Sequence, residues 1–274
     1  MPAARKTAIV TGAASGIGRA ITLGLLSAGI DVAAVDRTAP GLAALVGDAT
    51  GKSGALQTIH ADLAEPASFE QIAAAVLERH GKIDILVNNA GIGQASVRAD
   101  ARWNPIRLWE ATAEQWGRFL AVNATAPIMM ARAVLPHMLA ANSGRIVTVT
   151  TSLGTMVREG YLLYGASKAA AEAAMAVLSG DLKNTAVTSN VLVPGGVTNT
   201  AIVGDNMGDR ARMLQPEIMV PPLLFLVSDE AGRINGRRFV AADWDSALPA
   251  AQAAEKAGAP IAWMSIARMP IEPR

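Results

Sequence analysis

The stretch TAIVTGAASGIGRA, residues 7–20, decides the fold of this chain. Its short apolar run, Thr7–Thr11, is typical of a buried strand, and the residues from Gly16 onward are typical of a helix. The turn between them has glycines in the spacing G-x-x-x-G-x-G. Such a turn lets the backbone approach a pyrophosphate, while the helix N-terminus offers free N–H groups and the positive end of its dipole. The stretch therefore predicts a strand–turn–helix unit that binds a dinucleotide, with a purely structural glycine turn as the alternative.

The rest of the chain repeats this alternation of short apolar runs and longer helical stretches. Further strands are expected at Asp31–Asp36, Ala55–His60, Ile83–Asn88, Arg145–Thr150, Thr188–Val193 and Arg238–Ala241. Helices are expected at Gly16–Ala28, Gly41–Val46, Pro66–His80, Thr112–Ala140, Tyr161–Lys183 and Pro216–Ser228. Strands that alternate with helices form a parallel sheet with right-handed crossovers. No repeat and no linker rich in Pro, Gly or Ser divides the chain, so one domain is expected, with its core at about 5–242 and a C-terminal extension at 243–274.

Composition limits the classes of protein and partner. Hydrophobic residues make up 51% of the 274 residues and aromatic residues only 4%, which favours a parallel sheet buried under helices. The formal net charge is +1 and no basic stripe stands out, so a nucleic-acid partner is not expected. The chain has no cysteine and its three histidines are scattered, so no metal site is expected. Met1–Lys6 leads into no signal-peptide core and no apolar run approaches about 18 residues, so a cytoplasmic protein without a membrane span is expected.

Acidic residues follow the second and third strands. Asp36 ends the second strand, where a carboxylate binds the adenosine ribose hydroxyls and repels a 2′-phosphate. It favours NAD over NADP, and the neutral Ser15 supports that preference. The adjacent Arg37 leaves NADP open, because a guanidinium there could neutralise a 2′-phosphate, and Asp36 could also be an ordinary turn residue. Asp62, followed by Leu63, is placed to accept the adenine amino group.

Tyr164 and Lys168 lie four residues apart in a predicted helix, and therefore on one face of it. A free tyrosine has a pKa of about 10 and is a poor base at neutral pH. A neighbouring ammonium favours the phenolate and lowers that pKa. The pair predicts a general acid and base that moves a proton on and off an alcohol oxygen.

Taken together, these pieces resemble the classical short-chain dehydrogenase/reductase family. The matching segments are residues 11–18, Asp62, 88–91, Asn123, 144–151, Tyr164 with Lys168, and Pro194 with Gly195. The resemblance implies an α/β fold, Rossmann-like and doubly wound, with a mostly seven-stranded parallel sheet flanked by helices on both faces. It also implies a homotetramer or homodimer that pairs the two long helices Thr112–Ala140 and Tyr161–Lys183.

The resemblance implies hydride transfer between a nicotinamide cofactor and a secondary alcohol or ketone. Tyr164 matches the general acid and base, and Lys168 the residue that lowers its pKa and binds the nicotinamide ribose. Asn123 matches the residue that helps hold a proton-relay water. The expected cofactor-binding residues are Gly12, Ser15, Gly16, Ile17, Gly18, Asp36, Arg37, Asp62, Leu63, Asn89, Ala90, Gly91, Tyr164, Lys168, Pro194, Gly195 and Val197.

The sequence departs from the family in three places. Thr151 stands where the family has serine; its hydroxyl can donate the same hydrogen bond, and Ser152 is the fallback. The segment between Asn89 and Asn123 is longer than usual, and it either walls the substrate pocket, contacts a neighbouring subunit, or is a surface insertion packed by its own tryptophans. The extension after Asp243 is expected to pack on the domain or on a partner subunit.

The substrate is a small alcohol or ketone whose identity the sequence does not give. The expected pocket residues are Ser152, Leu153, Tyr161, Ile202 and Met207. Two other functions stay open from the residues: a non-redox dehydratase or epimerase with bound NAD, and a non-catalytic dinucleotide-binding regulator.

Overall fold

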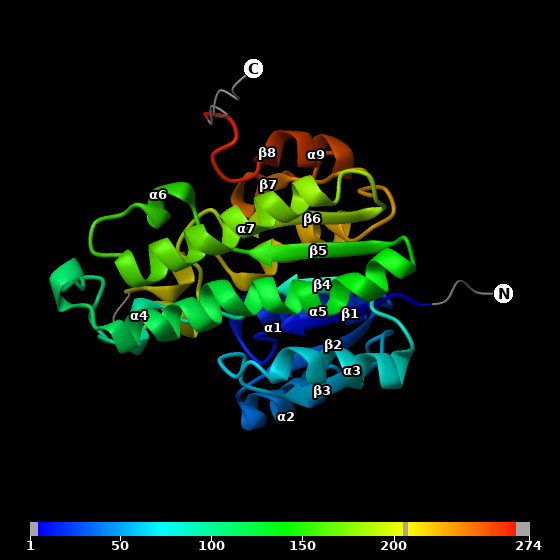
Figure 1. The fold of residues 1–274 in the computed structure, drawn as a ribbon, viewed down its shortest axis with the longest axis horizontal. Helices are drawn as coiled ribbons and strands as arrows, with labels where there is room; N and C mark the ends of the chain where they lie inside the picture. Colours follow the sequence, from blue (N-terminus) through cyan, green and yellow to red (C-terminus); the bar gives the residue numbers. More distant parts are fainter. Residues whose placement is uncertain (1–4, 205–207, 267–274) are drawn as a thin grey trace, which may run out of the picture.

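The computed structural model of the chain describes residues 5–204 and 208–266 (Figure 1). Its strands form one sheet in the order β3-β2-β1-β4-β5-β6-β7-β8. They are β1 (Thr7–Thr11), β2 (Asp31–Asp36), β3 (Leu56–His60), β4 (Ile85–Asn88), β5 (Gly144–Val149), β6 (Val187–Val193), β7 (Arg237–Val240) and β8 (Gly258–Pro260). β1 to β7 are parallel, and β8 is antiparallel to β7. The strand order reverses between β1 and β4, as in doubly wound sheets.

Helices cover both faces of this sheet. They are α1 (Gly16–Ser27), α2 (Ala39–Asp48), α3 (Ser68–His80), α4 (Ala113–Leu120), α5 (Ala126–Ala140), α6 (Leu153–Met156), α7 (Ser167–Asp181), α8 (Val220–Leu226) and α9 (Ala250–Ala257). Val10 of β1 packs in one core cluster with Leu25 of α1, whereas its neighbour Ile9 packs in another with Val134 of α5. Successive residues of a strand point to opposite faces, so β1 is apolar throughout because both faces are covered. α5 and α7 lie in front of the strands in Figure 1.

The longest helical stretch starts at a capping box and contains a π-helical turn. The Thr112 N–H donates to Gln115 Oε1 at 3.1 Å, and the Gln115 N–H donates to Thr112 Oγ1 at 3.2 Å. α4 then runs into the π-helical turn Ala121–Thr125, which leads directly into α5. Ala113–Ala140 is long and apolar enough to cross a membrane by length and composition alone, but half of its most apolar window is buried inside the fold, as in a core helix.

The predicted architecture is confirmed, with three corrections to its elements. An eighth strand, β8, lies in the predicted extension, so the sheet has one strand more than predicted and this part of the extension packs on the domain. α2 begins at Ala39, ahead of the predicted Gly41, because Pro40 suits a first helical turn. α3 begins at Ser68, and Pro66 lies in the preceding turn, which the Ser68 hydroxyl closes by donating to the Asp62 carbonyl at 2.8 Å.

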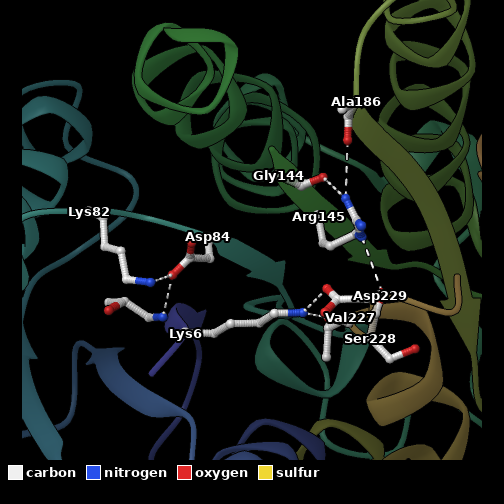
Figure 2. A network of polar contacts seen from close by, with 10 residues as sticks. Lys6, Lys82, Asp84, Gly144, Arg145, Ala186, Val227, Ser228 and Asp229 are labelled. Atoms are coloured by element: carbon white, nitrogen blue, oxygen red, sulfur yellow. Dashed lines mark hydrogen bonds and ion pairs between the residues drawn. The ribbon is translucent and has the colours of Figure 1, made fainter. Parts of the chain in front are cut away.

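Charged side chains tie together the amino ends of the central strands (Figure 2). Asp84 Oδ2, just before β4, accepts the N–H of Thr7 at the start of β1 at 2.7 Å. Lys6 Nζ pairs with Asp229 beyond α8 at 2.5 Å. Arg145, at the start of β5, donates to the carbonyl oxygen of Ala186, just before β6, at 3.1 Å. These pairs fix the amino edge of the sheet, and the candidate site lies at the opposite, carboxyl edge.

Candidate active site

The tyrosine of the predicted site lies in a π-helical turn directly before α7. This turn spans Leu162–Ala166, and a second π-helical turn, Ala121–Thr125, carries Asn123. π-helical turns are rare and occur often at functional sites. Tyr164 is half-buried beside a small core cluster that includes Phe119 and Leu163.

Burial controls the ionisation of this tyrosine. It raises the pKa of Tyr164 to about 12, since the phenolate is disfavoured away from water. A hydrogen bond with the Thr151 side chain lowers the pKa in part, and Tyr161 adds to the rise. The prediction that Lys168 brings this pKa below its ordinary value is therefore wrong for the described residues. At neutral pH the phenol keeps its proton.

Lys168 is 4% exposed, and its ammonium donates to the carbonyl oxygen of Val149, at the end of β5, at 3.0 Å. Burial lowers the pKa of Lys168 to about 8. A Cβ added at Gly91 would lie 3.2 Å from both Lys168 Nζ and Asn123 Oδ1. The loop after β4 and the first turn of α7 therefore meet at Lys168. A side chain at position 91 would crowd the ammonium of Lys168 and the amide of Asn123.

The two candidate hydroxyl groups after β5 point to different partners. The Thr151 side chain lies near enough to the phenol of Tyr164 to lower its pKa. The Ser152 hydroxyl is exposed and lies 2.7 Å from Thr155 Oγ1, one turn along at the start of α6. Between the two candidates, the geometry favours Thr151 as the hydroxyl that acts beside Tyr164.

Asn123 fastens the loop after β4 to the helix that carries the tyrosine. It is fully buried; its Oδ1 accepts the N–H of Ile92 at 2.9 Å and its Nδ2 donates to the Ile92 carbonyl at 3.0 Å. Nδ2 also donates to Ser167 Oγ at 3.0 Å, and Ser167 Oγ donates to the Tyr164 carbonyl at 2.9 Å. The side chain therefore positions backbone, and its predicted part in a water relay stays a prediction.

The glycine turn is shaped as a cradle that a side chain would fill. Gly12 and Gly16 have φ of +64° and +50°, in the left-handed region that favours glycine. A Cβ at Gly18 would lie 2.0 Å from the carbonyl oxygen of Gly12, so the first turn of α1 packs directly on the loop. Ser15 is exposed and makes no side-chain cap, so the first N–H groups of α1 are not capped by it. The residues fit a pyrophosphate at this helix N-terminus.

Polar groups surround the cradle. Asn89 Nδ2 donates to the carbonyl oxygen of Thr11 at 2.9 Å, which joins the ends of β1 and β4. Asp36 Oδ2 accepts the N–H of Ala14 at 3.0 Å and its Oδ1 accepts the N–H of Thr38 at 2.9 Å, so this carboxylate lies against the turn. Arg37 and Asp62 are exposed, and Leu63 is buried. This placement fits an adenosine moiety beside Asp36.

The loop after β6 faces the same turn. A Cβ at Gly16 would lie 2.8 Å from Thr200 Cγ2. Gly195, with φ of +92°, and Val197 are exposed, and Pro194 is half-buried. The N–H of Leu214 donates to the Val197 carbonyl at 3.0 Å and anchors the loop. The predicted cofactor residues are thus brought to one edge of the sheet.

The predicted substrate residues are only partly assembled. Ile202 lies against Gly93, where a Cβ would be 2.7 Å from its side chain, and Leu153 is half-buried. The Tyr161 ring lies under the guanidinium of Arg158, 4.6 Å from the ring centroid. Met207 lies outside the described residues.

The insertion lies against neighbouring segments and is not packed by its own tryptophans. Trp103 and Trp109 are 69% and 83% exposed, so packing by its own tryptophans is wrong. Arg98 pairs with Glu110 at 2.7 Å, and Arg107 pairs with Glu159. Gly204 packs against Ala95 and Ala99, so the insertion abuts the segment after β6.

Three residues with polar contacts near the site were missed by sequence reasoning. Glu172 and Arg238 form a buried ion pair behind Thr151. Gln94 is 6% exposed; its Nε2 donates to the Gly160 carbonyl at 2.8 Å, and its Oε1 has no hydrogen-bond partner among the described residues. Glu172 had a readable signal, because it follows Lys168 by one helical turn in an otherwise alanine-rich helix.

Comparisons with known proteins agree on a nicotinamide enzyme. The model of the short chain dehydrogenase family matches residues 6–210. D-threitol dehydrogenase of Mycolicibacterium smegmatis is 33% identical over an alignment of 251 residues, and the match covers 86% of this chain and 90% of that protein. The structure of 3-ketoacyl-(acyl-carrier-protein) reductase from Brucella melitensis with NADH has a TM-score of 0.73 at 27% identity, over 84% of this chain and 93% of that one. A candidate NAD(P)-dependent gluconate 5-dehydrogenase from Beutenbergia cavernae, solved with bound NADP, has a TM-score of 0.77 at 32% identity, over 87% and 96% of the two chains.

Lys168 gives the site a measurable pH dependence. Its pKa of about 8 in the folded chain lies below the ordinary 10.5, so the unfolded chain binds this proton more tightly. The charged, buried Lys168 lowers the free energy of unfolding, and this loss is complete below pH 8. As pH rises from 8 to 10.5 the lysine loses its proton and the free energy of unfolding increases, by about 3 kcal/mol in all. We therefore expect Lys168→Met to gain less stability than the wild type between pH 7.5 and 10, measured by urea unfolding. The exposed Lys183→Met is the control; equal pH dependence in wild type and Lys168→Met would contradict the assignment.

Proposed function

Because this chain belongs to the short chain dehydrogenase family, we propose that it transfers a hydride between NAD and a secondary alcohol or ketone, with Tyr164 as general acid and base. The chain is an NAD(P)-dependent oxidoreductase. The observation that carries the residue assignment is the buried Lys168, bonded to the Val149 carbonyl at the end of β5, with the Thr151 side chain next to the Tyr164 phenol at the edge of the sheet where the glycine cradle opens. The comparisons are with oxidoreductases and do not favour a dehydratase, epimerase or non-catalytic regulator.

The cofactor would be held by the cradle and by the residues around it. Gly12–Gly18 would hold the pyrophosphate, Asp36 the adenosine ribose, and the loop from Pro194 to Val197 the nicotinamide. When bound, the nicotinamide ring supplies the carbon that accepts or gives the hydride. The chain's own residues then have to orient the substrate oxygen and move its proton.

Tyr164 and Thr151 carry the proton chemistry. The protonated phenol donates its proton to a carbonyl oxygen in ketone reduction, and it must first lose that proton to act as base in alcohol oxidation. The Thr151 hydroxyl donates a second hydrogen bond to the same oxygen, which stabilises the charge that develops there. Lys168 is mostly charged at pH 7, since its pKa is about 8, and so stabilises the phenolate when the phenol has given its proton.

The substrate class we favour is a polyhydroxy alcohol. Two relatives above 30% identity bear the names of a threitol and a gluconate dehydrogenase. D-threitol and D-gluconate are therefore the first probes, with turnover followed at 340 nm; no turnover of either would reject this class.

The remaining finer assignments are a single domain, a cytoplasmic location and assembly as a homotetramer or homodimer. Apolar side chains on the two helices expected to pair support assembly, with Leu139 of α5 at 45% and Val177 of α7 at 67% exposed. Sedimentation that shows a monomer at micromolar concentration would reject it.

Asp36 predicts the choice of cofactor. A 2′-phosphate beside this carboxylate is repelled, and the nearby Arg19 is already paired with Asp48 at 2.6 Å. We expect NADH to bind about tenfold or more tightly than NADPH, measured by calorimetry, and Asp36→Asn to narrow that ratio. Tighter binding of NADPH by the wild type would mean that Arg37 overrides Asp36.

Tyr164→Phe tests the proton donor. Removal of the phenol hydroxyl is expected to abolish nearly all turnover, because the phenol is the group proposed to give its proton to, or take it from, the substrate oxygen. NADH binding is expected to persist. Ser27→Ala removes an exposed hydroxyl on α1 and serves as the control. Normal turnover by Tyr164→Phe would refute the assignment.

A further inference from the structure

Behind the wall of the active site lies a buried ion pair that the proposed chemistry does not use. Arg238 Nε of β7 donates to Glu172 Oε1 of α7 at 2.9 Å, and its Nη2 donates to Oε2 at 3.3 Å. The side chains of Glu172 and Arg238 are 0% and 6% exposed. Moving two charges out of water is unfavourable, and their attraction often does no more than offset that cost. A buried ion pair therefore adds little net stability to a fold. The role of this pair has to be inferred from the other hydrogen bonds that Glu172 and Arg238 make.

Two of those contacts fall on the residues that follow β5. Thr150 Oγ1 donates to Glu172 Oε2 at 2.6 Å, and Arg238 Nη2 donates to the carbonyl oxygen of Thr151. One residue earlier, the Val149 carbonyl accepts Lys168 Nζ. Three consecutive residues are thus each held by a buried charged side chain. Lys168 and Glu172 lie one turn apart on α7, so a single helix face supplies two of the three.

The C-terminal segment completes this cluster. Glu172 Oε1 accepts the N–H of Ala262 at 3.1 Å, and the chain turns there with φ of +53°, an unusual conformation for a residue other than glycine. Ile261 and Ala262 are 3% and 7% exposed and belong to the core beside α7. The carboxylate on α7 therefore has partners on three other segments: the residues that follow β5, β7 and the tail.

We propose that Glu172 and Arg238 are positioning residues for the reaction, and that they act through Thr151. β5 ends at Val149, so Thr150 and Thr151 lie beyond the last strand residue that pairs with β6. The ion pair holds the hydroxyl of the first and the carbonyl of the second, and so fixes the backbone that places the Thr151 side chain next to Tyr164. This inference rests on the proposed role of Thr151.

The test removes both charges at once, because a single change would strand the other charge in the interior. The double variant Glu172→Leu/Arg238→Met is assayed for kcat and KM with the probe polyol, for the dissociation constant of NADH, and for its melting temperature. We expect a folded protein that binds NADH within about twofold of the wild type, with kcat lowered about 10- to 100-fold by the misplaced hydroxyl. The exposed pair Asp245–Lys256, 3.3 Å apart, gives the control variant Asp245→Asn/Lys256→Met with unchanged kcat.

The same double variant in a protein that lacks the Thr151 hydroxyl separates a positioning role from a general loss of structure. The Glu172→Leu/Arg238→Met changes are also made in a Thr151→Ala protein. If the ion pair acts through Thr151, they lower kcat little further there, because the Thr151 hydroxyl is already absent. An equal further loss in that background, or wild-type kcat in the folded double variant, would overturn the proposal. Full kcat in Thr151→Ala alone would instead reject the proposed role of Thr151.

Thr150 gives the same test without any change of charge. Thr150→Val removes the hydroxyl that bonds Glu172 and is expected to lower kcat several-fold, whereas Thr150→Ser keeps the hydroxyl and retains kcat. Equal kcat in the two variants would count against the proposal even if the double variant does not fold. A crystal structure of Thr150→Val needs no substrate: Thr151 is expected to shift relative to the Tyr164 phenol, and an unmoved Thr151 would overturn the inference.

Discussion

The site depends on one constraint of a parallel sheet: its strands all end at the same edge, so residues far apart in the chain meet there. The glycine turn follows β1, Asp36 ends β2, Asn89 follows β4 and Thr151 follows β5. Each comes from a different crossover unit, yet direct hydrogen bonds join the turn to Asp36 and to Asn89. The opposite, amino edge of the sheet carries ion pairs that join neighbouring segments. The candidate binding groups therefore lie at one end of the strands and these structural ion pairs at the other.

Within that edge, buried charge is concentrated on one face of α7. Lys168 and Glu172 both reach the end of β5, and Arg238 approaches from β7. Buried charges are kept where they are paired or hydrogen-bonded, and here each one has a partner in the strand end. The hydroxyl of Thr150 and the carbonyl of Thr151 are thereby held in place, next to the Tyr164 phenol with which Thr151 is proposed to act.

Sequence reasoning predicted what local patterns determine. The strand, glycine turn and helix of residues 7–20 were predicted almost to the residue. The backbone freedom of glycine and the spacing of apolar residues depend only on nearby sequence. The choice between Thr151 and Ser152 needed the structure, since it depends on where β5 stops. β8 escaped prediction because its sequence, Gly-Ala-Pro, has little strand preference and is tolerated only at a sheet edge. The pKa of Tyr164 was predicted in the wrong direction, because burial beside Phe119 and Leu163 depends on packing between distant segments.

The central claim is that one edge of the sheet brings a dinucleotide and the Thr151–Tyr164 pair together. The most direct measurement is a crystal structure of the protein with NADH. The account predicts the pyrophosphate at the N-terminus of α1 and the nicotinamide between the loop from Pro194 to Val197 and Lys168, with its ring next to the Tyr164 phenol. NADH bound with its nicotinamide away from Tyr164, or with its pyrophosphate away from the glycine turn, would contradict it.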